Sequence, residues 1–255
     1  SGTTALMTTL GALDIGPGHE VILPPYTFVA TFNVITAYYA LPVFVDTDAA
    51  TFQIDTTKIP ATITAKTRLL LPVHVGGYAA DLDALDEIAR QHKIPCVADA
   101  CQAHLAEWRG RPVGPQGLGG CFSFQGSKNL PAGEGGAIVT DDEDFAGKCY
   151  NFHTPTGHKP GVPSGRGANF RLTEFQAGLL LAQISRLDAQ VRTRDANAAH
   201  LSALLLKIPG ITPARFTTGC TRSAYHAYLL RYDKDHFAGL PRTKFLQALA
   251  KENIP

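Results

Sequence analysis

Short runs of apolar residues alternate with longer segments in which apolar residues recur every three or four positions. Continuous apolar runs of about four to eight residues are typical of strands buried on both faces, and the longer period is typical of helices. The sequence predicts six strands, at residues 20–24, 42–46, 68–75, 94–100, 120–125 and 136–141. Between two of them, residues 81–92 carry Leu82, Leu85 and Ile88 at helical spacing. This alternation predicts an α/β fold with a mostly parallel sheet flanked by helices.

The pattern changes after the last of these strands. Thr173 and Gln176 form a capping-box signature, and the apolar residues that follow predict one long amphipathic helix reaching about Leu206. The proline and glycine residues of 207–213 end this helix, because neither residue continues one well.

Beyond that break, residues 224–233 read as a strand and residues 241–253 as a helix. We therefore expect a large domain over residues 1–207 and the beginning of a small C-terminal domain over residues 208–255. In this interpretation the large domain is shortened at its N-terminus and the small domain is incomplete.

Composition narrows the class of protein. The chain has 255 residues, of which 45% are hydrophobic, and this is enough for a full core. Its 23 basic and 22 acidic residues give a net charge of +1 without a run of Lys or Arg, which argues against nucleic acid as a partner. The apolar runs are far shorter than the roughly 20 residues that cross a bilayer, so no membrane span is predicted.

The cysteines indicate a reducing compartment. There are five, widely scattered and without a C-x-x-C pair, as expected for free thiols in a cytoplasmic protein. Cys149, His153 and His158 have a spacing that could suggest a metal site, but no fourth ligand of matching spacing accompanies them. We predict no metal.

One stretch raises a question of chemistry: "CFSFQGSKNLPAGEGG", residues 121–136, places Lys128 between a predicted strand and a glycine-rich turn. A P-loop is excluded because Gly120 and Gly126 have the wrong spacing and the order is Ser-Lys. A dinucleotide fingerprint is excluded too, since "GPQGLGG" (114–120) neither follows a strand nor opens a helix. We interpret the glycines of 114–120 as a surface turn.

A lysine that is partly removed from water can act as a nucleophile and form a Schiff base, and pyridoxal phosphate is the commonest cofactor held in this way. That cofactor needs a carboxylate at its ring nitrogen, a cradle for its phosphate and an aromatic face. Asp99 follows a buried strand, residues 1–4 ("SGTT") open a helical segment whose free amides suit phosphate, and Phe28 could stack on the ring. Each of these has an ordinary alternative: a turn cap, an N-cap and a core residue.

Three further residues follow the ends of predicted strands, where ligands bind in such sheets. Gln102 and His104 face the same way as Asp99 if the segment stays extended, and Gln102 better suits a contact to the ring hydroxyl. His74 is either a pocket residue or a core histidine, and the second interpretation is favoured.

Taken in order, six blocks of the sequence resemble those of the DegT/DnrJ/EryC1/StrS family of sugar aminotransferases, which are fold type I enzymes dependent on pyridoxal phosphate. The resemblance covers essentially the whole chain, through "SGTTAL", "PPYTFVAT", "PVFVDTD", "VADACQAHLAEWRGRPVG", "CFSFQGSKNLPAGEGGAIVTDD" and "GANFRLTEFQAG". The fourth and fifth blocks, through "QAHLAEWRGR" and "FSFQGSKNLPAGEGG", look most similar to the branch that aminates keto-cyclitols or keto-sugars.

The resemblance implies a role for each matching residue. Lys128 would carry the Schiff base and Asp99 would pair with the ring nitrogen, and both would be catalytic. The other cofactor-binding residues would be Gly2, Thr3, Thr4 and Ser123 at the phosphate, Phe28 on the ring and Gln102 at the ring oxygen. In dimers of the family an asparagine from the partner subunit completes the phosphate site, and Asn169 is the best match, close to Arg171.

The implied reaction is a ping-pong transfer of an amino group from glutamine or glutamate to a keto-sugar or keto-cyclitol. One branch of the family has histidine in place of the lysine and performs dehydration, so Lys128 favours amino transfer. The glycine- and proline-rich segment 152–165, with His153 and His158, is expected on the acceptor side, although solvent exposure is the simpler role for both histidines. Two alternatives stay open: a shortened relative that binds the cofactor with weak or no catalysis, and another pyridoxal enzyme such as a sugar dehydratase.

Overall fold

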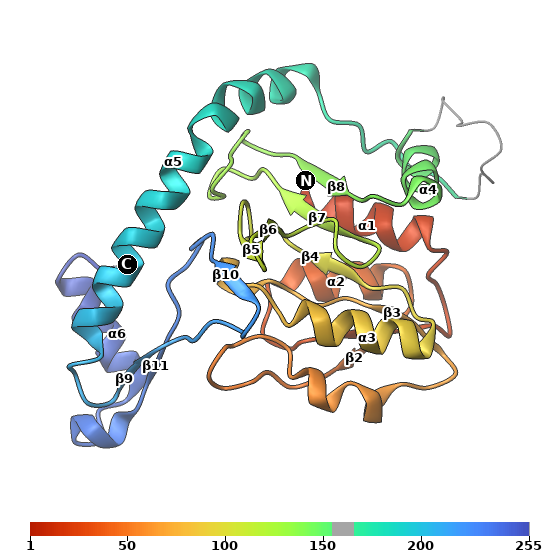
Figure 1. Ribbon diagram of the computed structural model, residues 1–255. Coiled ribbons are helices and arrows are strands. Elements are labelled where there is room, and N and C mark those ends of the chain that lie inside the picture. The colour runs from red at the N-terminus through yellow and green to blue at the C-terminus, as the bar shows by residue number, and fades with distance from the viewer. Residues whose placement is uncertain (155–165, 255) are drawn as a thin grey trace.

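The computed structural model describes residues 1–154 and 166–254, and Figure 1 shows how its elements are arranged. A twisted sheet with helices on both faces makes up the body of the molecule, and a long helix leads away from it. The strands of the body are β1 (Glu20–Leu23), β2 (Leu41–Phe44), β3 (Thr67–Leu70), β4 (Val97–Asp99), β7 (Gly119–Ser123) and β8 (Gly136–Val139).

These six strands correspond to the six that the sequence predicts. β1 pairs in parallel with β2 and with β3, and β4 pairs in parallel with β7. Single parallel bridges, Leu70 to Cys96 and Val73 to Asp99, join β3 to β4. Among these six strands β8 alone is antiparallel to its neighbour, β7. The prediction of a mostly parallel sheet is confirmed.

Two hydrophobic clusters cover the two faces of the sheet. Neighbouring residues of β1 point to opposite sides: Ile22 belongs to the cluster under α3 (Leu82–His92), whereas Val21 belongs to the other cluster. Three helices pack on that second cluster: α1 (Gly2–Ala12), α2 (Val29–Ala37) and α4 (Glu143–His153). Burial on both faces explains why these strands read as continuous apolar runs.

Two predictions, one of a strand and one of a surface turn, need correction. The predicted strand 68–75 ends as regular structure at Leu70, and a 3-10 turn, η3 (Val75–Gly77), follows it with Gly76 at a φ of 69°. The glycines of 114–120 do not all lie in a surface turn, because Gly119 and Gly120 are buried at the start of β7. A Cβ on Gly120 would lie 2.8 Å from the carbonyl oxygen of Gly114, so this strand needs glycine to pass so close to another segment.

The long helix predicted from the capping box is α5 (Glu174–Leu205), and its capping box is formed by Thr173 and Gln176. In Figure 1 α5 leads away from the sheet, and α6 and the small ribbon of β9 and β11 lie at its far end. The remaining elements are β5 (Glu107–Trp108), β6 (Arg111–Pro112), β9 (Ile211–Pro213), β10 (Cys220–Arg222), β11 (Leu230–Tyr232), α6 (Arg242–Lys251) and the 3-10 turns η1 (Thr56–Lys58), η2 (Pro60–Thr62) and η4 (Lys234–Phe237).

The helix predicted at 241–253 is confirmed as α6, but the strand predicted at 224–233 is too long. Only Leu230–Tyr232 forms a strand, because the residues before it bond to the body instead: the N–H groups of Ala224 and Ala227 donate to the carbonyl oxygens of Gly77 and Gly76. No helix in the described ranges has both the length and the apolar character that crossing a membrane requires.

Candidate active site

A cavity of about 410 Å³ opens where the chain leaves β3, β4 and β7, beside the first turn of α1. Its size is ordinary for a small-molecule site. Every predicted site residue except Thr4 and Asn169 lines it: Gly2, Thr3, Phe28, Asp99, Gln102, Ser123 and Lys128. The segments that carry these residues are distant in sequence and meet because parallel strands end at one edge of the sheet.

One end of the cavity is suited to an anionic group. The helix α1 begins at Gly2, with Ser1 as its N-cap, so the amides of Gly2 and Thr3 belong to the first turn, where a helix has unpaired N–H groups. Ser123, buried at the end of β7, lies against this turn: a Cβ on Gly2 would be 2.7 Å from Cβ of Ser123 and 2.8 Å from Sγ of Cys101. Glycine therefore lets the helix start approach the serine hydroxyl closely.

Asp99 forms the floor of the cavity and is 5% exposed. Thr31 of α2 donates its hydroxyl to Oδ2 at 2.7 Å, and the backbone N–H of Cys101 donates to Oδ1 at 3.1 Å. Thr27 and Thr31 share a further hydrogen bond of 2.7 Å. These partners fix the carboxylate in place and satisfy a polar group that would be costly to bury alone.

Lys128 and Phe28 lie together on the wall. Lys128 follows β7 in a turn in which its N–H donates to the carbonyl oxygen of Gln125 at 2.9 Å. Its Nζ lies 6.0 Å from the centre of the Phe28 ring. Phe28 is 64% exposed, at the N-cap of α2, although a phenylalanine after a strand is more often buried. The ring thus offers a free aromatic face beside the amine.

Gln102 has a defined orientation. Its Oε1 accepts a hydrogen bond of 2.7 Å from the N–H of Gly76 in η3. The Nε2 group is consequently the end left to donate to a ligand in the cavity, which suits an anionic ring oxygen.

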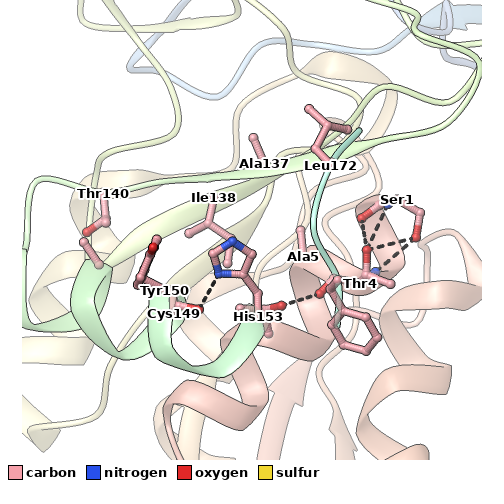
Figure 2. Close-up of a pocket in the computed structure, with 14 residues that line it drawn as sticks. Ser1, Thr4, Ala5, Ala137, Ile138, Thr140, Cys149, Tyr150, His153 and Leu172 are labelled. Atoms are coloured by element: carbon pink, nitrogen blue, oxygen red, sulfur yellow. Dashed lines mark hydrogen bonds between the residues drawn. The ribbon is translucent and has the colours of Figure 1, made fainter. Parts of the chain in front are cut away.

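Thr4 lies outside this cavity. Its hydroxyl accepts from the backbone nitrogen of Ser1 at 2.9 Å, and its N–H donates to the Ser1 hydroxyl, so both groups belong to the capping box of α1. Figure 2 shows Thr4 on the wall of a different cavity, between α1, β8 and α4, together with Thr140 and His153.

Asn169 also lies away from the cavity of its own chain. It is exposed, and its Oδ1 accepts a hydrogen bond of 2.9 Å from Nε of Arg171. Most of the predicted acceptor segment, including His158, lies outside the described residues. His153 is described: it ends α4, and its Nδ1 contacts the carbonyl oxygen of Cys149 at 3.0 Å.

The two other histidines singled out by the sequence belong to the interior. The chain after Asp99 turns rather than staying extended, so His104 does not face the way Asp99 does and packs instead against Phe122 and Phe124. His74 is fully buried, and its Nδ1 accepts from the N–H of Ala80 at 3.2 Å. Burial lowers the pKa of each imidazole to about 4, so both are neutral near pH 7.

The residues that sequence reasoning missed are those that hold Asp99. Thr31 is in the "PPYTFVAT" block but belongs to a helix, and only the packing of α2 on the sheet brings it to a carboxylate 68 positions away. Cys101 lines the cavity as well, and burial, followed by the charge of Asp99, holds the pKa of its thiol well above the usual range. This cysteine therefore stays a thiol.

The donor set of the cavity fits pyridoxal phosphate. The amides of Gly2 and Thr3 with the Ser123 hydroxyl suit the phosphate, Asp99 suits a protonated ring nitrogen, and Phe28 suits the ring. No group of three His, Cys, Asp or Glu side chains in residues 1–154 and 166–254 is arranged to hold a metal.

Known proteins are similar to this chain over nearly its whole length. At the sequence level, the chain is 40% identical over 264 residues to the L-glutamine:scyllo-inosose aminotransferase of Streptomyces griseus, covering 99% of this chain and 62% of that protein. Among solved structures, DesV of S. venezuelae, determined with a ketimine intermediate, has a TM-score of 0.89 and 34% identity over 99% of this chain and 66% of DesV. NtdA of Bacillus subtilis, solved with the bound cofactor PMP, has a TM-score of 0.80 and 30% identity over 93% of this chain and 55% of NtdA.

The chain spans about 62% of the length of the curated relatives that it matches. The fold is that of the fold type I enzymes that depend on pyridoxal phosphate, as the sequence predicts. The family model described as "DegT/DnrJ/EryC1/StrS aminotransferase family" matches residues 1–255, and this chain therefore belongs to that family.

Proposed function

We propose that the protein is an aminotransferase that uses pyridoxal phosphate to move an amino group from glutamine or glutamate to a keto-cyclitol or keto-sugar. The observation that carries the proposal is the cavity in which Lys128, Asp99 and the helix start at Gly2 come together. The relative in S. griseus, named for L-glutamine and scyllo-inosose, supports the choice of donor and acceptor class.

When bound, pyridoxal phosphate supplies an aldehyde that links to amines and a ring that stabilises negative charge beside the linked nitrogen. The residues of this chain would bind and orient the cofactor. Gly2, Thr3 and Ser123 would hold the phosphate, and Asp99 would keep the ring nitrogen protonated. Phe28 would cover one face of the ring, and Nε2 of Gln102 would donate to the ring oxygen.

Lys128 would move the proton in both halves of the cycle. As a free amine its Nζ would take the proton from Cα of the amino donor, which is general-base catalysis. In the second half it would give a proton to the carbon that had been the carbonyl carbon of the ketone. A single amine at this wall of the cavity suffices because the two half-reactions are chemically the reverse of each other.

We also propose a cytoplasmic homodimer in which Asn169 reaches the phosphate of the partner's site. Asn169 is exposed and is held by Arg171, and the first half of α5 exposes large apolar side chains, as an uncovered interface would: Phe175, Leu179, Leu181 and Ile184. The five cysteines are all free thiols, consistent with a reducing compartment.

The phosphate cradle can be tested through its glycine. Gly2→Ala is expected to weaken binding of pyridoxal phosphate by about tenfold or more, and to lower the free energy of unfolding by about 1–3 kcal/mol, because the new Cβ meets Ser123 and Cys101 below normal contact distance. Fluorescence titration with the cofactor and thermal unfolding measure the two effects. Gly16→Ala is the matched control, since beyond its chain neighbours the nearest atom to a Cβ there is Nη2 of Arg166 at 3.7 Å, an ordinary contact. Equal cofactor affinity in both variants would contradict the cradle.

The proposed reaction is tested by its first half. The purified protein loaded with pyridoxal phosphate is expected to lose its visible absorption band when L-glutamine is added and to release the corresponding keto acid. Adding scyllo-inosose should then restore the band and yield an aminated cyclitol, detected by mass spectrometry. A band that persists with every amino donor would support a relative that only binds the cofactor. Loss of water from the ketone, without any transfer of nitrogen, would support a dehydratase.

A further inference from the structure

Lys128 lies between two cavities. It lines the cofactor cavity described above and also a second, more open cavity of about 660 Å³ against α5. The α5 wall of this second cavity is formed by Gln183, Arg186, Gln190, Thr193 and Arg194. Their spacing of three and four residues places them on one face of the helix. We call this surface the α5 wall.

The α5 wall is cationic without a compensating acid. None of the described residues that line the cavity is Asp or Glu, and none of the ion pairs found within residues 1–154 and 166–254 involves Arg186 or Arg194. Arg186 donates to the side chain of Gln183, and Nη1 of Arg194 donates to the carbonyl oxygen of Tyr225 at 3.1 Å. These bonds orient the guanidinium groups and leave further N–H donors on each.

The positive charges of Lys128 and Arg194 both act on a neighbouring histidine, His226. Burial first, then the charges of Lys128 and Arg194, lower the pKa of His226 to about 4. The Lys128 and Arg194 charges therefore act on one point of space, and a neutral His226 adds no cation there near pH 7. An anion placed between them would be attracted by both.

The amino donor carries a carboxylate, which is the negative charge that the α5 wall lacks. In an α-amino acid the carboxylate is bonded to the same carbon as the proton that Lys128 would remove, so when that proton faces Nζ the carboxylate must lie close by. A keto-cyclitol carries no charge and cannot use the arginines in this way. Arginine binds carboxylates with paired hydrogen bonds, which also fix the rotation of the group.

We propose that the α5 wall, through Arg186 and Arg194, is the subsite for the carboxylate of the amino donor. This inference rests on the proposed function, and it assigns the donor carboxylate to the side of Lys128 that faces α5. The two arginines are positioning and specificity residues: they hold the donor so that its Cα proton faces Nζ of Lys128.

The test compares Arg186→Gln and Arg194→Gln with Arg192→Gln. Each of the first two is expected to raise the L-glutamine concentration for half-maximal donor conversion by about tenfold. This is the lower end of the effect of losing a hydrogen bond to a charged group, because both arginine side chains are exposed. The rate at saturating donor and the affinity for pyridoxal phosphate should change little. Arg192 is the matched control, since it lies on the same helix, outside the cavity, and pairs with Asp188. Arg186→Lys, which keeps the charge, should recover part of the loss.

A binding measurement tests the carboxylate subsite without requiring the reaction to occur. Calorimetric titration with glutarate, which has carboxylates and no amine, is expected to show binding to the wild-type protein, at least about tenfold weaker in the Arg186→Gln, Arg194→Gln double variant. Thermal unfolding would establish that the double variant is folded. If the wild-type protein converts no donor, the proposed function fails, and the glutarate titration still decides the subsite.

Three results would overturn the inference: no glutarate binding by the wild-type protein, equal glutarate affinity in the double variant, or half-maximal glutamine concentrations in Arg186→Gln and Arg194→Gln equal to that of Arg192→Gln. A fourth concerns the kind of anion. If inorganic phosphate binds through the same arginines more tightly than glutarate, the wall is a phosphate subsite and the carboxylate assignment is wrong.

Discussion

Lys128→Ala is expected to reduce amino transfer from L-glutamine by about 10²- to 10⁴-fold, the range that a positioned general acid–base contributes. The physical reason is that the proposed mechanism makes this amine the proton carrier in both half-reactions, and no other lysine of residues 1–154 and 166–254 lines the cavity. Cofactor binding should weaken less than activity falls, because Ser123, Gly2 and Asp99 remain. Keto-acid release measures the first effect, and equilibrium dialysis of pyridoxal phosphate measures the second.

A chemical trap distinguishes the role of Lys128 from a general loss of structure. Borohydride should fix the cofactor covalently to the wild-type protein on the peptide that contains residue 128, and it should fix none to the alanine variant. Lys148→Ala is the matched control: Lys148 forms an exposed pair with Asp144 on α4, which contributes little to stability. A reducible link that survives in the Lys128 variant would show that the assignment is wrong.

Asp99→Asn is expected to lower donor conversion by about 10²- to 10³-fold, the loss typical when one electrostatic stabiliser is removed from a site. Asparagine has nearly the same shape, so the fold can keep it: its oxygen can still accept from the N–H of Cys101, and its amide can donate to the hydroxyl of Thr31. What is lost is the negative charge that would hold the ring nitrogen protonated.

A comparison of donor conversion with thermal stability distinguishes a chemical role of Asp99 from a structural one. Donor conversion should fall while the thermal unfolding midpoint stays close to that of the wild type. Asp141→Asn, an exposed aspartate after β8, should leave both unchanged. If the Asp99 variant retained wild-type conversion, the carboxylate would be a structural group held by Thr31 and not part of the chemistry.

Local signals account for the elements that the sequence predicts well. The six strands are continuous apolar runs because both faces of the sheet are covered, and α5 begins at a capping box that is complete within four residues. The predictions that failed depend on partners distant in sequence. Residues 224–229 look like a strand, but the N–H groups of Ala224 and Ala227 donate to the carbonyl oxygens of Gly77 and Gly76, and no local pattern contains that information.

The site residues also divide into those that local signals predict and those that depend on partners distant in sequence. Asp99, Ser123 and Lys128 follow strand ends, and the topology of a parallel sheet is enough to bring such residues together. Thr31 could not be found in this way because its contact with Asp99 depends on how α2 packs. His104 was misplaced because the chain turns after Asp99. The assignment of roles to the lining residues and the domain division after residue 207 stay predictions.

The position of Phe28 and Thr31 on one helix has a consequence for how well the site keeps its dimensions. Phe28 is the N-cap of α2 and Thr31 is in the first turn of the same helix, where it contacts Asp99. One turn of helix rises about 5.4 Å, which is a fixed length of the backbone. The helix backbone therefore fixes the distance between the aromatic wall and Thr31, and the hydrogen bond of 2.7 Å from Thr31 ties this segment to the carboxylate floor on β4. A shift of α2 against the sheet would move Phe28 and Thr31 together, so the aromatic wall cannot move relative to the floor without disturbing the hydrogen bond to Asp99.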